Sequence, residues 1–208
     1  MLQYALALFV AFTLAAQSTK EPPAKAYDVP EAYEVYAAVL ALDPPKGDLL
    51  IAESTVPFNS CQDAHSDKSV ASAIADYKRT NKDSWLLQKK FDRGRNYKLL
   101  SQKEISDLKQ PDPKGGFFWY FPDETEITHL SAVGFNANKT VAFVEMDVQC
   151  GGLCGRGTSY ALEKRDGKWQ EWKDHRTAKV TKRKKNPDGS WTVALSGGPY
   201  IGYCGWNY

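Results

Sequence analysis

The chain has 208 residues, of which 42% are hydrophobic and 25% charged, a composition typical of a globular domain and not of a disordered or fibrous protein. Its 27 basic and 25 acidic residues leave a net charge of +2. So balanced a charge argues against nucleic acid or a membrane surface as the main partner.

The first residues have the features of a signal peptide. Residues 1–16 carry no charged side chain and contain an apolar run followed by small residues, although no Lys or Arg precedes the run. The run is shorter than the roughly 20 residues that a transmembrane helix needs. We expect cleavage after Ala15, Ala16 or Ser18, so that 1–18 form the signal peptide and the mature chain has no transmembrane span. An uncleaved anchor is the alternative.

A signal peptide implies that the chain is exported, and this affects how the four cysteines are interpreted. In an oxidising compartment disulfides persist, and Cys61, Cys150, Cys154 and Cys204 can pair in three ways. We favour Cys150 with Cys154, closing a short glycine-containing loop, and Cys61 with Cys204, tying the early part of the chain to its end.

Residues 19–29 are polar and contain prolines, which predicts a flexible leader before a single α+β domain at 30–208. The domain should begin with a helix, because Asp28 and Pro30 are start signals and Asp43-Pro44-Pro45 stops it. Its apolar stripe has helical spacing and consists of Ala32, Val35, Tyr36, Val39 and Leu40.

Several shorter elements follow. Ser101 and Glu104 form a capping-box pattern that should open a short helix ending near Leu108. The pattern predicts a strand at 47–54, a helix at 67–79, a further helical turn or two at 85–91 and an extended segment at 97–100. An aromatic cluster occupies 117–121.

From Glu126 onward, hydrophobic residues recur at every second position, as expected for strands. Turn sequences at 136–139, 166–167 and 186–189 separate the runs. The expected strands are 128–135, 140–149, 158–164, 168–172, 178–184 and 190–195. The fold class is therefore α+β, with an antiparallel β-meander of five to six strands and the N-terminal helices packed on one face.

The strand at 141–150 shows two distinct faces. One face is apolar throughout and should contact the helices; it consists of Ala142, Val144, Met146, Val148 and Cys150. The other face begins apolar and then carries Glu145, Asp147 and Gln149, which predicts that the two acids lie on the open face of the sheet.

Several motifs together resemble a family of uncharacterised exported bacterial proteins with the pattern S-x-V-G-F-N, C-G-x-L-C-G-x-G, L-x-K and G-x-W. They are SAVGFN at 131–136, CGGLCGRG at 150–157, LEK at 162–164 and GKW at 167–169, together with the YEVYAAVL helix and YKLLS at 97–101 followed by Glu104. The resemblance covers most of 31–169, and from about Arg176 onward the chain departs from it. It implies fold and location but no reaction, since the family carries no assigned activity.

The Cys150–Cys154 turn has competing interpretations. Two cysteines could form a redox pair or half a metal site, but redox motifs have two intervening residues at a helix start, whereas here three lie between strands. The glycines could cradle an anion with help from Arg156, yet no Lys-Ser/Thr ending and no helix follow. We interpret the turn as a structural disulfide.

Glu145 and Asp147 are the candidate catalytic residues. They lie on one side of a strand, roughly 7 Å apart along it, which suits acid–base work or cation binding, although such acids on an open face are more often only solvated. The three histidines, His65, His129 and His175, are widely spaced. A Cys61–His65 nucleophile is permitted by spacing alone, and no Gly-x-Ser-x-Gly elbow occurs.

Residues 173–185 carry seven basic residues and one acidic residue. Within them Lys182, Arg183, Lys184 and Lys185 are the candidate ligand-binding residues for an anionic polymer; the alternative is a solvated hairpin tip. The closing residues 197–208, rich in Tyr, Trp and Gly, either pack on the sheet or offer aromatic platforms to a sugar or peptide.

Two functional hypotheses follow. The first is a non-enzymatic exported protein, periplasmic or secreted, of binding or envelope-associated type, which uses the open face of the sheet or the basic hairpin. Its candidate partner is an anionic polymer or envelope surface, and no specific nucleic acid, cofactor or metal is expected. The second is a small exported hydrolase using Glu145 and Asp147, or another carboxylate set, in a groove beside the cysteine turn.

Overall fold

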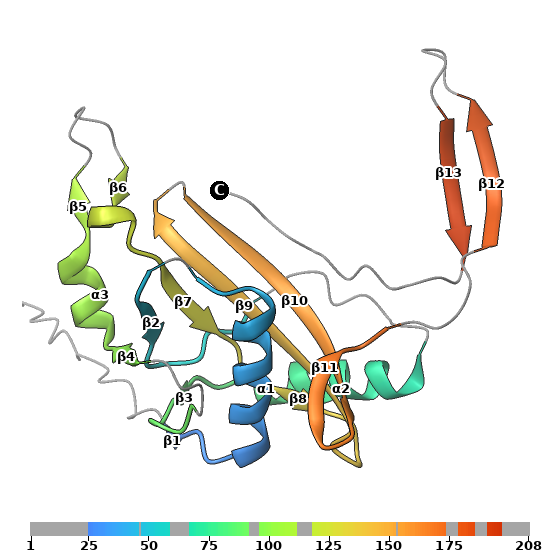
Figure 1. Cartoon of the computed structure of the whole chain (residues 1–208), viewed down its shortest axis with the longest axis horizontal. Coiled ribbons are helices and arrows are strands. Elements are labelled where there is room, and N and C mark those ends of the chain that lie inside the picture. The colour runs from blue at the N-terminus through green and yellow to red at the C-terminus, as the bar shows by residue number, and fades with distance from the viewer. Residues whose placement is uncertain are drawn as a thin grey trace, which may run out of the picture.

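The computed structural model describes residues 25–45, 47–58, 67–91, 96–111, 118–152, 154–173, 179–185 and 191–196. Three helices accompany a central sheet in this part of the chain: α1 (Pro30–Leu42), α2 (Lys68–Thr80) and α3 (Gln102–Leu108) (Figure 1). The predicted α+β class is confirmed. The predicted signal peptide, 1–18, lies outside the described residues.

Nine of the described strands form one mixed sheet, with the order β11-β10-β9-β7-β2-β4 along its main path. The six strands of this path are β2 (Leu49–Ala52), β4 (Tyr97–Leu100), β7 (Ile127–Leu130), β9 (Val141–Gly151), β10 (Cys154–Arg165) and β11 (Lys168–Glu171). The run from β7 through β9 and β10 to β11 is antiparallel, as expected. The expected five-to-six-strand meander is nevertheless wrong for the sheet as a whole, because β2 pairs in parallel with both β4 and β7.

The parallel half of the sheet follows from the connections between its strands. α2 lies between β2 and β4 along the chain, and α3 lies between β4 and β7. A helical crossover returns the chain to the same end of the sheet, so the next strand runs parallel to the last. The early strands therefore join the sheet that the later hairpins build.

Shorter strands complete the body. They are β1 (Lys25–Ala26), β3 (Trp85–Leu86), β5 (Gln110–Pro111), β6 (Trp119–Tyr120) and β8 (Gly134–Phe135), and a 3-10 turn spans Pro122–Glu124. The expected helical turns at 85–91 are wrong. Trp85 donates its backbone N–H to the Thr55 hydroxyl at 3.0 Å, and Leu87 donates to the Glu53 carbonyl at 2.7 Å, so this segment is extended.

The end of the predicted leader lies against the fold. β1 pairs in parallel with β3, and Tyr27 is buried. The hydroxyl of Tyr33 donates to the Tyr27 carbonyl at 2.8 Å, which fixes this part of the chain to α1.

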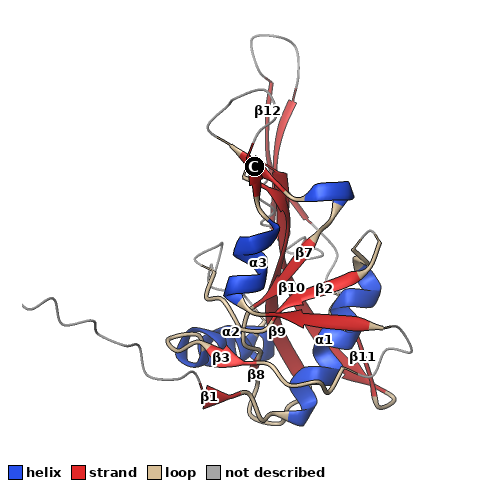
Figure 2. Cartoon of the chain, turned by 90° about the vertical axis from the view of Figure 1, so that its left-hand side faces the viewer, coloured by secondary structure: helices blue, strands red, loops and turns tan. Residues whose placement is uncertain are grey.

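Helices cover both faces of β9, which corrects the expectation that they pack on one face. The even-numbered side chains from Ala142 to Val148 share the largest core with α1, as predicted. Val141 and Phe143 point the other way and pack against α2. Because strand side chains alternate, α1 and α2 lie on opposite sides of β9 (Figure 2).

The strands β12 (Lys179–Lys185) and β13 (Trp191–Ser196) form a separate antiparallel two-stranded sheet. In Figure 1 this hairpin stands away from the nine-stranded sheet. The two strands match the expected ones at 178–184 and 190–195 to within one residue at each end.

The predicted helix starts take different forms. α1 begins with Pro30 in its first turn and has no side-chain cap, so Asp28 does not cap it. Asp67 caps α2 by accepting the N–H groups of Ser69 and Val70, at 2.8 and 3.1 Å.

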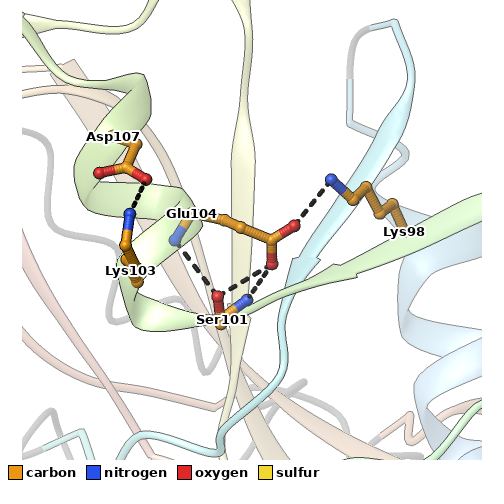
Figure 3. Close-up of polar contacts among 5 residues, drawn as sticks. All are labelled: Lys98, Ser101, Lys103, Glu104 and Asp107. Atoms are coloured by element: carbon orange, nitrogen blue, oxygen red, sulfur yellow. Dashed lines mark hydrogen bonds and ion pairs between the residues drawn. The ribbon is translucent and has the colours of Figure 1, made fainter.

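The capping box of α3 is present as predicted (Figure 3). The Ser101 hydroxyl accepts the Glu104 N–H at 3.2 Å, and the Glu104 carboxylate accepts the Ser101 N–H at 2.8 Å. Lys98 adds an ion pair with Glu104 at 2.9 Å. The Ser101 N–H, the Lys98 ammonium and the Ser101 hydroxyl together lower the pKa of Glu104 to about 2.

The capping box can be tested through the pKa of Glu104. Replacing Ser101→Ala removes the hydroxyl that holds the carboxylate in place, so the pKa should rise from about 2 toward the ordinary 4.5. The stabilisation that Glu104 gives is present above that ordinary pKa and is lost as the pH falls toward 2. The measurement is an NMR titration of the Glu104 carboxyl carbon.

The control is Lys103→Ala, because Lys103 pairs with Asp107 at 2.6 Å and points toward that residue and not toward the Glu104 carboxylate (Figure 3). It should leave the pKa of Glu104 unchanged. An unchanged pKa in the Ser101→Ala variant would contradict the assignment.

Candidate functional site

The two candidate catalytic acids do not lie on an open face. Glu145 has no exposed surface and Asp147 is 9% exposed. The alternation along β9 does place them on one side of the strand, but α2 covers the neighbouring part of that side. The prediction of solvated acids is therefore wrong, because the sequence pattern did not show that a helix packs there.

Glu145 joins three elements of the fold. Tyr77 of α2 donates its hydroxyl to Glu145 Oε2, and Ser159 of β10 donates its hydroxyl to Oε1 at 2.9 Å. Burial and the neighbouring Glu145 carboxyl raise the pKa of Tyr77, which keeps the phenol protonated as a donor. The contacts of Glu145 thus attach α2 to β9 and β10, and they enclose the carboxylate away from any substrate in solution.

The SAVGFN motif lies beside Glu145, and its first three residues, 131–133, form the break between β7 and β8. Ser131 accepts the backbone N–H of Glu145 on its hydroxyl at 2.9 Å and donates its own N–H to the Glu145 carbonyl at 3.0 Å. Asn136 accepts the N–H groups of Thr140 and Val141 at 2.8 and 3.0 Å, which closes the turn into β9. The polar residues of the motif therefore bind backbone.

Side chains from outside the motif hold the break from both faces of the sheet. Tyr36 of α1 donates its hydroxyl to the Ser131 carbonyl at 2.7 Å. Asn81, at the end of α2, accepts the Ala132 N–H at 2.8 Å and donates to the Ala132 carbonyl at 2.9 Å. Sequence reasoning missed Asn81, although an Asn at a helix C-terminus is a recognised capping signal.

A second polar pair lies next to Glu145. His129 of β7 is the register partner of Asp147, so both side chains lie on the same face as Glu145. Burial lowers the pKa of His129 below its ordinary 6.5. A hydrogen bond with Gln149 raises the pKa in part, and the positive charge of Lys109 lowers it further. His129 is therefore neutral at physiological pH.

His129 is only partly buried. Its Nε2 atom is buried without a hydrogen-bond partner among the described residues. The sequence offered no local signal for the pair, because its members are eighteen positions apart and only the β7–β9 register brings them together. His65 and His175 lie outside the described residues.

The described residues hold no group of three or more His, Cys, Asp and Glu side chains arranged for a metal ion. Glu145, Asp147 and the partly buried His129 form a polar band across β9 and β7.

The predicted disulfide between Cys150 and Cys154 is present, with the two Cα atoms 5.0 Å apart. Its turn packs against Trp119, whose carbonyl accepts the Gly152 N–H at 2.7 Å. A Cβ on Gly152 would lie 3.2 Å from the Trp119 indole nitrogen, so the close approach favours glycine. Cys61 and Cys204 lie outside the described residues, and their pairing stays a prediction.

The structure does not favour the interpretation of this turn as an anion cradle, because two of the groups that would bind the anion contact protein instead. The Gly152 N–H is bonded to protein, as described above. Arg156 is paired with Asp43 at 3.3 Å and with Glu126 at 3.1 Å. Burial lowers the pKa of Arg156, but the carboxylates of Asp43 and Glu126 have the larger effect, so the pKa is raised overall. Arg156 therefore ties β10 to the C-terminal end of α1.

The candidate ligand-binding residues lie together on β12, where the backbone register pairs Lys182 with Ala194, Arg183 with Val193, Lys184 with Thr192 and Lys185 with Trp191. The closing segment 197–208 lies outside the described residues. None of the three described helices is long and apolar enough to cross a membrane.

Comparison with known proteins adds no assignment. No family model, no curated protein and no solved structure matches the chain. The resemblance to uncharacterised exported bacterial proteins stays a prediction.

The role of Tyr77 can be tested by Tyr77→Phe, which removes the donor to a fully buried carboxyl group. We expect a loss of about 1–3 kcal/mol in the free energy of unfolding, measured by urea denaturation at neutral pH. The control is Tyr97→Phe, a half-buried tyrosine whose oxygen accepts the Phe91 N–H at 3.3 Å. An equal or smaller loss for Tyr77→Phe than for the control would contradict the structural role of Glu145.

Proposed function

We propose that the protein is a non-enzymatic exported protein that binds an anionic polymer or envelope surface through its basic hairpin, β12–β13. The observation that carries the proposal is the separation of this hairpin from the nine-stranded sheet, combined with its charge. Five of the seven β12 residues are Lys or Arg, and neither strand contains an acidic residue.

The charge is concentrated within the chain. Residues 173–185 carry seven basic residues and one acidic residue, a net charge of +6, whereas the whole chain carries +2. The remaining residues therefore sum to −4. A balanced total conceals a basic segment attached to an acidic body, and such a segment attracts anionic surfaces over about 8–10 Å at moderate salt.

The surroundings of Glu145 support a non-enzymatic role. A hydrolase needs its carboxylates in contact with substrate, whereas Glu145 is enclosed by Tyr77 and Ser159. Export itself remains an expectation from the signal-like residues 1–18 and is compatible with the Cys150–Cys154 disulfide.

The test changes Lys182, Arg183, Lys184 and Lys185 to Ser together. Retention on dextran sulfate should weaken. In a plot of the logarithm of the affinity against the logarithm of the salt concentration, the slope should become less negative by roughly 3, because four contacts are lost.

A matched control changes Lys25, Lys68, Lys82 and Lys89 to Ser. These exposed lysines lie on the body, and their loss gives the same net charge. The control should keep most of the retention. Equal retention by the two variants would show that total charge, and not the hairpin, controls binding, and would overturn the proposal.

A further inference from the structure

A hollow of about 340 Å³ lies between α1 and the turn that leads from β10 into β11. Figure 1 shows α1 and β11 side by side. The hollow is lined by one stripe of α1, by the start of β11 and by the segment after β3, through Tyr33, Glu34, Ala37, Lys168, Trp169 and Lys90 among others. Its volume is at the lower end of the roughly 300–1,000 Å³ typical of small-molecule sites, so a ligand here has to be small.

The two aromatic rings of the hollow offer it apolar surface. Tyr33 and Trp169 are 4% and 8% exposed, and the polar atoms of both rings already have partners within the protein. The Tyr33 hydroxyl donates to the Tyr27 carbonyl and accepts the Gln88 N–H at 2.9 Å. The Trp169 indole N–H donates to the Glu34 carboxylate at 3.0 Å. What the rings present to a ligand is therefore carbon.

The hollow depends on small residues. Ala37 follows Tyr33 by one helical turn on the same side of α1 and is half-buried. Its methyl group leaves room that a longer side chain would fill. Gly167, in the turn before β11, lines the hollow without a side chain. Two rings, a methyl group and bare backbone therefore border the space, which suits a planar apolar group.

The charged groups of the hollow favour an anion. Lys168 is exposed and forms no ion pair with any residue in the described part of the chain. Lys90 pairs with Asp28 at 2.7 Å, but the two side chains are 43% and 73% exposed, so the pair is weak and the ammonium keeps donors for a second acceptor. The acid of the lining is Glu34, and Lys164 already neutralises it at 2.7 Å. Two lysines are thus available to a negative group.

We propose that this hollow binds a small aromatic carboxylate. The aromatic ring of the ligand packs against Tyr33, Trp169 and Ala37, because aromatic pairs gain more than their buried area alone provides. Its carboxylate meets the ammonium groups of Lys168 and Lys90. The site is separate from the basic hairpin and does not depend on its function.

The probe is 3-phenylpropionate, titrated into the protein while the NMR resonance of the Trp169 indole N–H is followed. We expect saturable binding with a Kd of about 1 mM or tighter. The amide 3-phenylpropanamide keeps the ring but lacks the charge, so it should bind about fivefold more weakly, a difference that diminishes with salt. 3-Cyclohexylpropionate keeps the charge but lacks the aromatic ring, and it should bind about threefold more weakly.

The apolar part of the site is tested by Ala37→Phe, which fills the hollow and should weaken 3-phenylpropionate binding about tenfold or more. The matched control is Ala41→Phe, which places the same side chain one turn further along α1, where Ala41 is exposed and does not line this hollow. The control should bind like the unmodified protein. Circular dichroism verifies that each variant is folded.

The charged part is tested at the exposed Lys168, where a substitution does not disturb the core. Lys168→Gln should weaken 3-phenylpropionate about threefold and leave the affinity for the amide unchanged. Lys82→Gln gives the same net charge at an exposed lysine that does not line the hollow, and it should change neither affinity.

Four results would overturn the proposal. The first is an unchanged Trp169 resonance at 3-phenylpropionate concentrations well above about 1 mM. The second is equal affinity for the carboxylate and the amide, and the third is equal affinity for the phenyl and cyclohexyl acids. The fourth is equal binding by Ala37→Phe and Ala41→Phe, which would locate the ligand outside this hollow.

Discussion

The structure depends on satisfying the backbone at one interruption of the sheet, residues 131–133 between β7 and β8. These residues are almost completely buried, so their N–H and C=O groups need partners within the protein. Tyr36 donates its hydroxyl to the Ser131 carbonyl, and the Asn81 side chain hydrogen-bonds both the N–H and the C=O of Ala132. The Tyr27 hydroxyl accepts the N–H of Val133 at 2.9 Å. The break therefore fixes α1 and α2 from opposite faces.

The contact between α2 and the sheet follows from this arrangement. Immediately after the break, Gly134 lies so close to α2 that an added Cβ would be 2.2 Å from the Tyr77 backbone nitrogen. At this distance the Tyr77 hydroxyl reaches Glu145 in the neighbouring strand. The acids of β9 are consequently structural groups within a polar band of the sheet.

The sequence predicted the local structure well where one segment contains the whole signal. Helical spacing located α1 and α2, the capping box located α3, and alternation along β9 identified the side chains that meet α1. It failed where two distant segments had to be combined. The parallel pairing of β2 with β4 and β7, and the position of α2 over Phe143, depend on long-range packing that no short pattern encodes.

The candidate site shows the same division. The sequence singled out Glu145 and Asp147 and their common side of the strand, but their environment comes from Tyr77, Ser159 and the register partner His129. Those three residues are separated from the acids by at least 12 positions along the chain. The Cys150–Cys154 disulfide was predictable because its geometry is local to one turn.

The most direct test of the central claim is the free energy of unfolding of Gly134→Ala, measured by urea denaturation. If α2 contacts the sheet at Gly134 as described, the added methyl group meets backbone atoms that cannot move aside, and we expect a loss of about 3 kcal/mol or more. Gly167→Ala is the reference, since Gly167 has φ of +75° in an open turn and should lose only about 1 kcal/mol. A loss for Gly134→Ala no larger than that of Gly167→Ala would contradict the account.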